Sequence, residues 1–206
     1  MFSVLRYSTV LLLSVLVAGF AFVAYTQWPL GALVHPDMGA NFNRHPIAIY
    51  MHVFCAALAL LIGPFQFPDR LRRARPRLHR WLGRIYLGVG VGLGGIAGLY
   101  MAMFAYAGIV AKLGFVGLAL AWLYTGARAY QHARDRDFVA HRAWMLRNFS
   151  LTFAAVTLRI YLGVSIASGW QFAVFYPVIA WLCWLPNAAV GEWLARRVET
   201  RASSAA

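Results

Sequence analysis

Acidic residues are scarce in this sequence. Only six of its 206 residues are Asp or Glu, against 19 Lys or Arg, and no two acids are adjacent. Carboxylate acid–base pairs and divalent-metal sites both need acids that lie together. We therefore expect no chemistry of these two kinds, and histidine and arginine are the side chains left for a site.

Cysteine and the common catalytic signatures are equally sparse. The two cysteines, Cys55 and Cys183, lie inside apolar stretches and form no CxxC pair, which excludes a disulfide framework and a cysteine zinc site. We expect both to pack as small hydrophobic side chains. No hydrolase triad, P-loop, zinc-protease motif or dinucleotide fingerprint occurs, so the sequence assigns no reaction.

Long apolar runs make up most of the chain. The sequence is 62% hydrophobic, with a mean hydropathy of +0.63, and a run of about 20 apolar residues is long enough to cross a membrane. Six such runs cover residues 8–28, 47–66, 81–107, 113–131, 143–167 and 172–194. The sequence predicts an all-α polytopic membrane protein, an antiparallel bundle of six transmembrane helices with a four-helix core from the second to the fifth. Residues 1–199 are expected to form one domain and 200–206 a disordered tail.

Basic residues are placed asymmetrically along these helices. Sixteen of the 19 fall on one side of the six-helix arrangement, and the others are Arg44, Lys112 and Arg159. Basic loops stay in the cytoplasm, so we expect a bacterial inner-membrane protein with both termini cytoplasmic. Its expected partners are the lipid bilayer and anionic headgroups at the cytoplasmic face. Nucleic acid is not needed to explain the net charge of +13.

A histidine–arginine pair followed by a second arginine occurs twice, each time where a hydrophilic loop turns into an apolar run. The copies are His79-Arg80 with Arg84, and His141-Arg142 with Arg147. They predict an internal repeat of two helical hairpins. A bis-histidine haem needs two imidazoles from neighbouring helices, which predicts His79 and His141 as iron ligands and the four arginines as partners of anionic groups. The same arginines suit lipid phosphates, and His132 is a further candidate at this boundary.

Two helices carry a stripe of polar and small side chains on one face. His52 and Gln66 belong to the stripe of the second helix; Asn148, Thr152 and Arg159 belong to that of the fifth. Lipid-facing surfaces rarely carry such residues, so both stripes are expected to line an internal cavity. His52 has three open interpretations: a hydrogen-bonded structural group, a haem ligand that marks a second, outer site, or a group that carries protons or contacts substrate.

Glycine recurs at four-residue spacing in the third helix, for example at Gly90, Gly94 and Gly98. This spacing lets a neighbouring helix approach closely. The alternative is that the missing side chains leave room for a flat porphyrin or quinone ring.

Glu192 is the only acid inside an apolar run. A lone carboxylate there is costly unless it is paired, which predicts an ion pair with Arg84 or Arg147. In the same helix, Pro177 and Pro186 predict kinks.

The second to fifth helices resemble a bacterial membrane family known as domain of unknown function 2306. The resemblance rests on His52, on Gly63-Pro64-Phe65-Gln66-Phe67, on both histidine–arginine motifs and on Thr152-Phe153-Ala154-Ala155-Val156-Thr157-Leu158-Arg159. It implies that these residues belong together and carries no activity. A looser similarity, to four-helix cytochrome b proteins, rests on one histidine in each of four helices.

The leading hypothesis is a membrane redox protein that binds b-type haem, or a quinone, among the second to fifth helices and passes electrons to a redox partner. One alternative is a binding or transport protein whose cavity takes a small anionic or lipid-like ligand. The other is an accessory subunit of a membrane complex.

An absorption spectrum separates these hypotheses. If the chain binds b-type haem, protein purified in mild detergent after haem-replete expression shows a sharp Soret band, and dithionite produces split reduced bands. A colourless protein would remove haem and leave ligand binding or transport.

Overall fold

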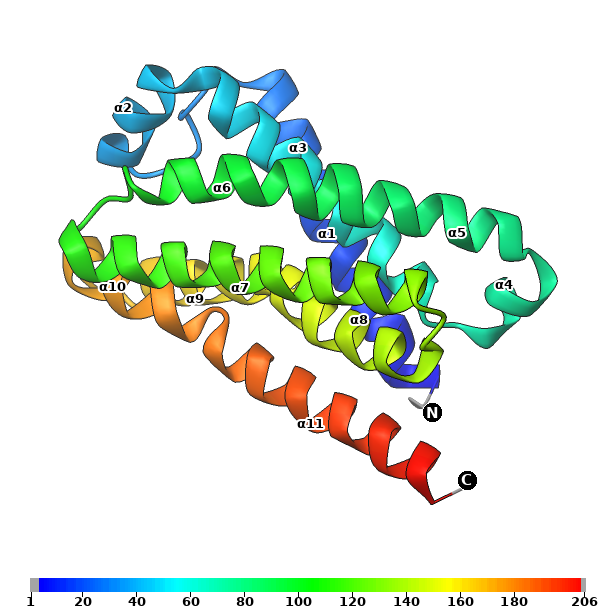
Figure 1. The fold of residues 1–206 in the computed structure, drawn as a ribbon. Helices are drawn as coiled ribbons and strands as arrows, with labels where there is room; N and C mark the ends of the chain where they lie inside the picture. Colours follow the sequence, from blue (N-terminus) through cyan, green and yellow to red (C-terminus); the bar gives the residue numbers. More distant parts are fainter. Residues whose placement is uncertain (1–3, 205–206) are drawn as a thin grey trace. The chain divides into compact units, whose positions relative to one another are not determined.

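The computed structural model describes residues 4–204, and every regular element in that range is helical (Figure 1). Six of the described helices are long and apolar enough to cross a membrane: Leu5–Gln27, Pro46–Gln66, Pro76–Ala102, Gly108–Arg134, Phe138–Ala167 and Phe172–Ser203. The chain is therefore an all-α polytopic membrane protein, which confirms the predicted fold class.

The six spans fall into two compact units, Met1–Phe104 and Ala105–Ala206, where the sequence predicts one domain. The first unit holds α1 (Val4–Gln27), α2 (Pro36–Arg44), α3 (Pro46–Ile62), the 3-10 turn η1 (Gly63–Gln66), α4 (Asp69–Ala74), α5 (Pro76–Arg84), the π-helical η2 (Ile85–Leu93) and α6 (Gly94–Ala102). The second holds α7 (Gly108–Arg134), α8 (Phe138–Thr152), α9 (Ala154–Ala167), α10 (Phe172–Leu182) and α11 (Leu185–Ser203).

Each unit is built around one of the predicted hairpins. In the first unit α3 packs against η2 and α6, and α1 packs on α3. In the second, α7 packs against α8, α11 lies along α8, and α10 packs on α7. The sixth span therefore packs along both helices of its hairpin.

Glycine brings α3 close to the third span. A Cβ atom built on Gly90 would lie 2.8 Å from the Cβ of Ala59, and one on Gly94 would lie 3.0 Å from the Cβ of Cys55. At Gly98 the added atom would lie 2.6 Å from Nδ1 of His52. The packing interpretation is confirmed at these three glycines, because α3 fills the space that a flat ring would need.

Several helices extend beyond the predicted apolar runs. The third and fifth spans begin at Pro76 and Phe138, and α11 continues to Ser203, so the predicted disordered tail starts inside a helix. Residues 205–206 lie outside the described part. Hydropathy marks the part of a helix that needs lipid, whereas Pro at the first turn of α5 and the Asp137 cap of α8 mark where each helix begins.

The sixth span breaks before Pro186. α10 continues through Pro177 but ends at Leu182, and α11 begins at Leu185. Proline has no N–H to continue the helical hydrogen bonds. At the break, the indole Nε1 of Trp184 donates to the carbonyl of Ala180 at 3.0 Å. The predicted kink is therefore present before Pro186, and this hydrogen bond holds the Trp184 ring.

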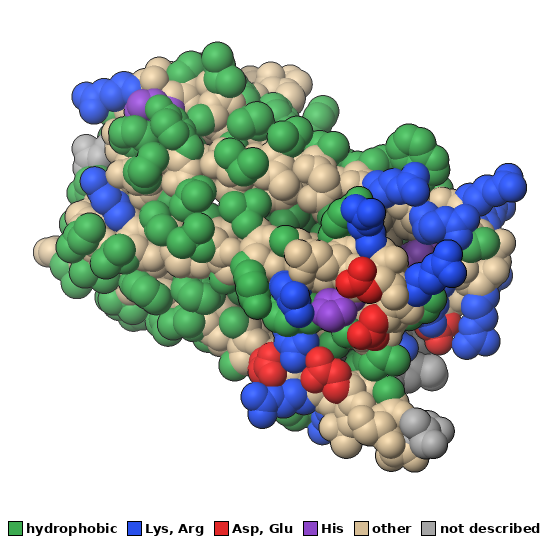
Figure 2. Space-filling view, viewed as in Figure 1, with side chains coloured by type: hydrophobic (Ala, Val, Ile, Leu, Met, Phe, Trp, Pro, Cys, Tyr) green, Lys and Arg blue, Asp and Glu red, His purple; other side chains and the backbone are tan. Residues whose placement is uncertain are grey.

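Apolar side chains cover the outside of the helices. Along α7, for example, Ile109, Leu113 and Leu120 are exposed, and Figure 2 shows hydrophobic surface over this helix. A soluble protein of this size would bury such a surface. The outer face of the chain is suited to lipid.

Substitution of Gly90 by alanine is expected to lower the free energy of unfolding by about 1–3 kcal/mol, because the new methyl group overpacks the contact with Ala59. Gly88→Ala is the matched control from the same η2 segment, since its added Cβ meets nothing within 4 Å. Thermal unfolding in mild detergent measures both. Equal melting temperatures for the two variants would contradict the close contact.

Candidate functional site

The two histidine–arginine motifs occupy the same place in their helices. His79 is the fourth residue of α5 and His141 the fourth of α8, and their N–H groups bond to the carbonyls of Arg75 and Asp137 at 3.1 and 2.9 Å. The second arginine, however, follows five residues after His79 and six after His141. One residue turns a helix by about 100°. The copies therefore match at histidine and point their second arginine in different directions.

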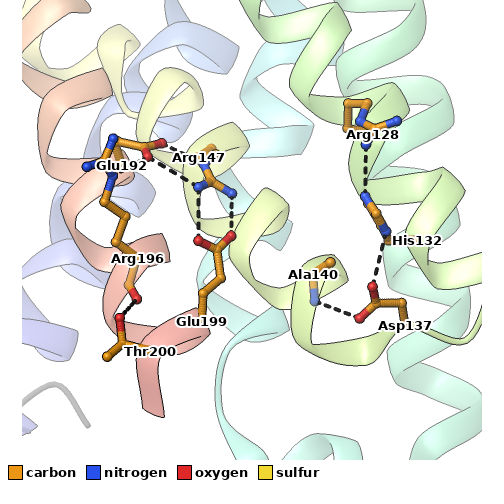
Figure 3. Close-up of polar contacts among 9 residues, drawn as sticks. All are labelled: Arg128, His132, Asp137, Ala140, Arg147, Glu192, Arg196, Glu199 and Thr200. Atoms are coloured by element: carbon orange, nitrogen blue, oxygen red, sulfur yellow. Dashed lines mark hydrogen bonds and ion pairs between the residues drawn. The ribbon is translucent and has the colours of Figure 1, made fainter. Parts of the chain in front are cut away.

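Arg147 holds two carboxylates of α11 (Figure 3). Its Nε donates to Oε2 of Glu192 at 2.7 Å, and its Nη1 donates to Oε1 of Glu199 at 3.0 Å. The ion pair predicted for Glu192 is confirmed, with Arg147 as the partner. Glu199 is not predicted as a partner. It lies seven residues, about two helical turns, after Glu192, and this spacing is the signal that places both acids on one face.

Close contact between α8 and α11 makes this ion pair possible. A Cβ atom on Gly191 would lie 2.8 Å from the Cβ of Ser150 and 3.3 Å from the Cα of Arg147. The next residue is Glu192, whose other oxygen accepts from Nε of Arg196 at 2.7 Å. Gly191 thus allows α8 and α11 to lie close together, and the following residue, Glu192, supplies the negative charge for Arg147.

A pocket of about 300 Å³ lies beside the ion pair, among α7, α8 and α11. Its apolar walls are formed by Ala121, Leu151, Ala188 and the rings of Trp144 and Trp184. Thr125, Arg147 and Glu192 supply its polar atoms. The Arg147 guanidinium also lies 4.7 Å from the centre of the Trp144 ring, so one charged group contacts both the acids and the aromatic wall.

Asn148 and Thr152 join α8 to α7. The Asn148 amide donates to the carbonyl of Trp122 at 2.8 Å and to Oγ1 of Thr125 at 2.9 Å. The indole of Trp122 donates to Oγ1 of Thr152 at 2.8 Å. Asn148 is fully buried. These two predicted cavity residues therefore hold the hairpin together, and the pocket is lined by other residues.

His52 and Gln66 lie in the first unit. A carbonyl oxygen only accepts, so Nδ1 of His52 donates to the carbonyl of Gly94 at 2.9 Å. This favours the structural interpretation of His52. Gln66 is buried in η1, and its Nε2 has no hydrogen-bond partner among the described residues.

The histidines of the second unit are held by neighbouring groups of α7 and its loop. Nδ1 of His141 donates to the carbonyl of Ala129 at 2.8 Å. Nε2 of His132 accepts from Arg128 at 3.2 Å, and its Nδ1 faces Asp137 at 3.6 Å (Figure 3). His132 therefore links α7 to the Asp137 cap of α8.

The remaining predicted site residues do not gather at the pocket. Arg159 bonds to the carbonyl of Ala155 in its own helix at 2.8 Å, and Arg80, Arg84 and Arg142 are exposed. Among the described residues no group of three or more His, Cys, Asp or Glu side chains is placed to hold a metal ion. His79 and His141 belong to different units, so their predicted joint ligation of haem stays a prediction.

Comparison with known proteins gives a family and no activity. Residues 49–195 match the family described as "Predicted membrane protein (DUF2306)". The match covers more than half of the chain, so the chain belongs to this family. No curated protein and no solved structure matches it.

Removal of the Arg147 charge is expected to destabilise the second unit. In Arg147→Gln, Glu199 loses the arginine that it contacts and Glu192 keeps only Arg196. A partly buried pair broken in this way costs about 1–3 kcal/mol. Adding Glu192→Gln and Glu199→Gln should restore most of the loss. Thermal unfolding measures the series, with the exposed Arg142→Gln as control. A triple variant no more stable than the single one would exclude this role.

Proposed function

For this member of a family of membrane proteins, we propose that the second unit binds a small, uncharged amphipathic molecule and that the chain acts in its binding or transport. The pocket beside Arg147 is the observation that carries the proposal. A volume of about 300 Å³ lies at the lower end of the range for small-molecule pockets. It is lined by residues of spans that cross the membrane, where lipid-soluble molecules are concentrated.

The pocket has the two kinds of surface that an amphipathic molecule needs. Leu151 and the two tryptophan rings offer contact to an apolar body, and Thr125 and Glu192 offer hydrogen-bonding atoms to a polar head. Tryptophan suits such a site because its ring contributes a large apolar contact at little conformational cost.

Charge balance favours an uncharged ligand. The guanidinium of Arg147 already bonds to two carboxylates, and Arg196 bonds to one of them. Two arginines and two glutamates sum to zero, so an anion that entered the pocket would lose its hydration and gain no net positive charge from this cluster. Of the ligand classes predicted from the sequence, a lipid-like molecule or a quinone fits this pocket better than a small anion.

Filling the pocket should abolish binding. Ala188 lines it, and Ala188→Phe places a ring in the space. Ala189→Phe is the matched control, because Ala189 is exposed on the same helix and is not among the lining residues. We expect 1-decanol to raise the melting temperature of the wild type and of Ala189→Phe, and not that of Ala188→Phe.

Decanoate tests the charge argument with the same chain length. It should stabilise the wild type less than 1-decanol does at equal concentration, in nanodiscs of phosphatidylcholine. Equal shifts for Ala188→Phe and Ala189→Phe would mean that the alcohol acts through the bilayer, and the pocket would then have no part in binding. A larger shift with decanoate would show that the pocket prefers anions.

Haem ligation is a second candidate, favoured by the tautomer of His141. Since Nδ1 carries the proton donated to Ala129, a neutral His141 has its lone pair on Nε2, and such a second-shell carbonyl orients a metal-binding imidazole. The exposed Arg142 of the same helix would pair with a propionate. Haem would supply one-electron transfer. The absorption spectrum tests this candidate, and His141→Ala should remove the Soret band.

A further inference from the structure

The hairpin of α4 and the first turns of α5 carries the densest positive charge of the chain. Residues 69–84 contain a single acid, Asp69. They also contain seven arginines: Arg70, Arg72, Arg73, Arg75, Arg77, Arg80 and Arg84. All seven are exposed. Figure 2 shows Lys and Arg side chains gathered over α4 and α5. The pocket of the second unit makes no use of this surface.

Most of this charge is uncompensated. Asp69 bonds to Arg72 at 2.7 Å and to Arg73 at 3.4 Å. The other five arginines have no carboxylate partner in the part of the chain that the structure describes. Arg147, by contrast, holds two acids, so its charge is compensated within the chain.

Helical spacing gathers three of the uncompensated arginines on one side of α5. Arg77, Arg80 and Arg84 are separated by three and four residues, so they share a face. Trp81 lies beside them and is 62% exposed, and Leu78 is 41% exposed. Exposed tryptophan next to arginine is typical of the level at which headgroups meet acyl chains.

The position of this face relative to the bilayer follows from the helix that carries it. α5 continues through η2 into α6 as one membrane span, Pro76–Ala102. Its first turns therefore enter the lipid from the headgroup level. Arginine binds phosphate oxygens in a bidentate manner, and a free anion would have no use for the apolar Trp81 and Leu78 beside it.

We propose that the arginine face of α5, formed by Arg77, Arg80 and Arg84 with Trp81, binds the phosphate headgroup of an anionic phospholipid in the surrounding bilayer. The arginines hold the phosphate, and Trp81 and Leu78 contact the glycerol and upper acyl region. This binding is independent of the ligand proposed for the pocket, since it uses only residues of the first unit.

Two double variants test the site against charge in general. Arg77→Gln/Arg80→Gln and Arg72→Gln/Arg73→Gln each remove two positive charges from the same hairpin. The wild-type protein is released from nanodiscs that contain equal amounts of phosphatidylglycerol and phosphatidylcholine, and native mass spectrometry measures which lipid stays bound. We expect phosphatidylglycerol to be retained preferentially. An arginine near an anionic surface strengthens binding about fivefold. We expect several-fold weaker retention in the α5 variant, up to about 25-fold, and a change within about twofold in the α4 variant.

An equal loss of phosphatidylglycerol retention in the two variants would mean that the lipid is attracted by the positive charge of the whole hairpin, and it would overturn the proposed site. Equal retention of both lipids by the wild type would overturn it as well. Release of the lipid by millimolar inorganic phosphate would indicate a site for soluble anions, and displacement by RNA would indicate a nucleic-acid surface. Either result would overturn the proposal.

A measurement on wild type alone keeps the test decisive if the α5 variant does not fold. Phosphatidylglycerol with a photoreactive headgroup should crosslink to residues of α5, above all around Trp81. Crosslinks confined to other helices would overturn the proposal.

Discussion

A guanidinium enclosed among apolar helices needs counter-charges, and this requirement organises the second unit. Of the six acids in the chain, two are placed on Arg147. Their spacing fixes the register of α11 on α8, and Gly191 lets the helices come close enough for the contact. The same register positions Ala188 and Glu192 on the pocket, and the break before Pro186 turns Trp184 towards it.

The two units use arginine in opposite ways. In the second unit Arg147 is neutralised, so the pocket beside it suits an uncharged molecule. In the first unit the arginines of α5 are exposed and have no carboxylate partner among the described residues, and the proposed lipid site rests on this arrangement. Scarcity of acidic residues explains both arrangements, because every arginine beyond the reach of those six carboxylates must find its anion outside the chain or remain in water.

Composition and periodicity were enough to predict the spans, both hairpins and an ion pair of Glu192 with either Arg84 or Arg147, and they offered helix packing as one of two roles for the glycines. Each of these depends on a local rule, such as span length or the cost of a lone charge in lipid. The division into two units, the second acid on Arg147 and the pocket were not predicted, because they depend on which helix packs on which. The motif comparison was also misleading at one point: a single extra residue turns Arg147 inward, while Arg84 stays exposed.

The π-helical segment η2 has a consequence for insertions and deletions. Its hydrogen bonds reach one residue further back than those of an α-helix, as when the N–H of Gly94 bonds to the carbonyl of Val89. Such a segment has more residues per turn than an α-helix of the same length. Loss of one residue between Ile85 and Leu93 can therefore be absorbed by a return to α-helical bonding, whereas the same loss within α3 or α7 would rotate one half of the helix against its neighbours.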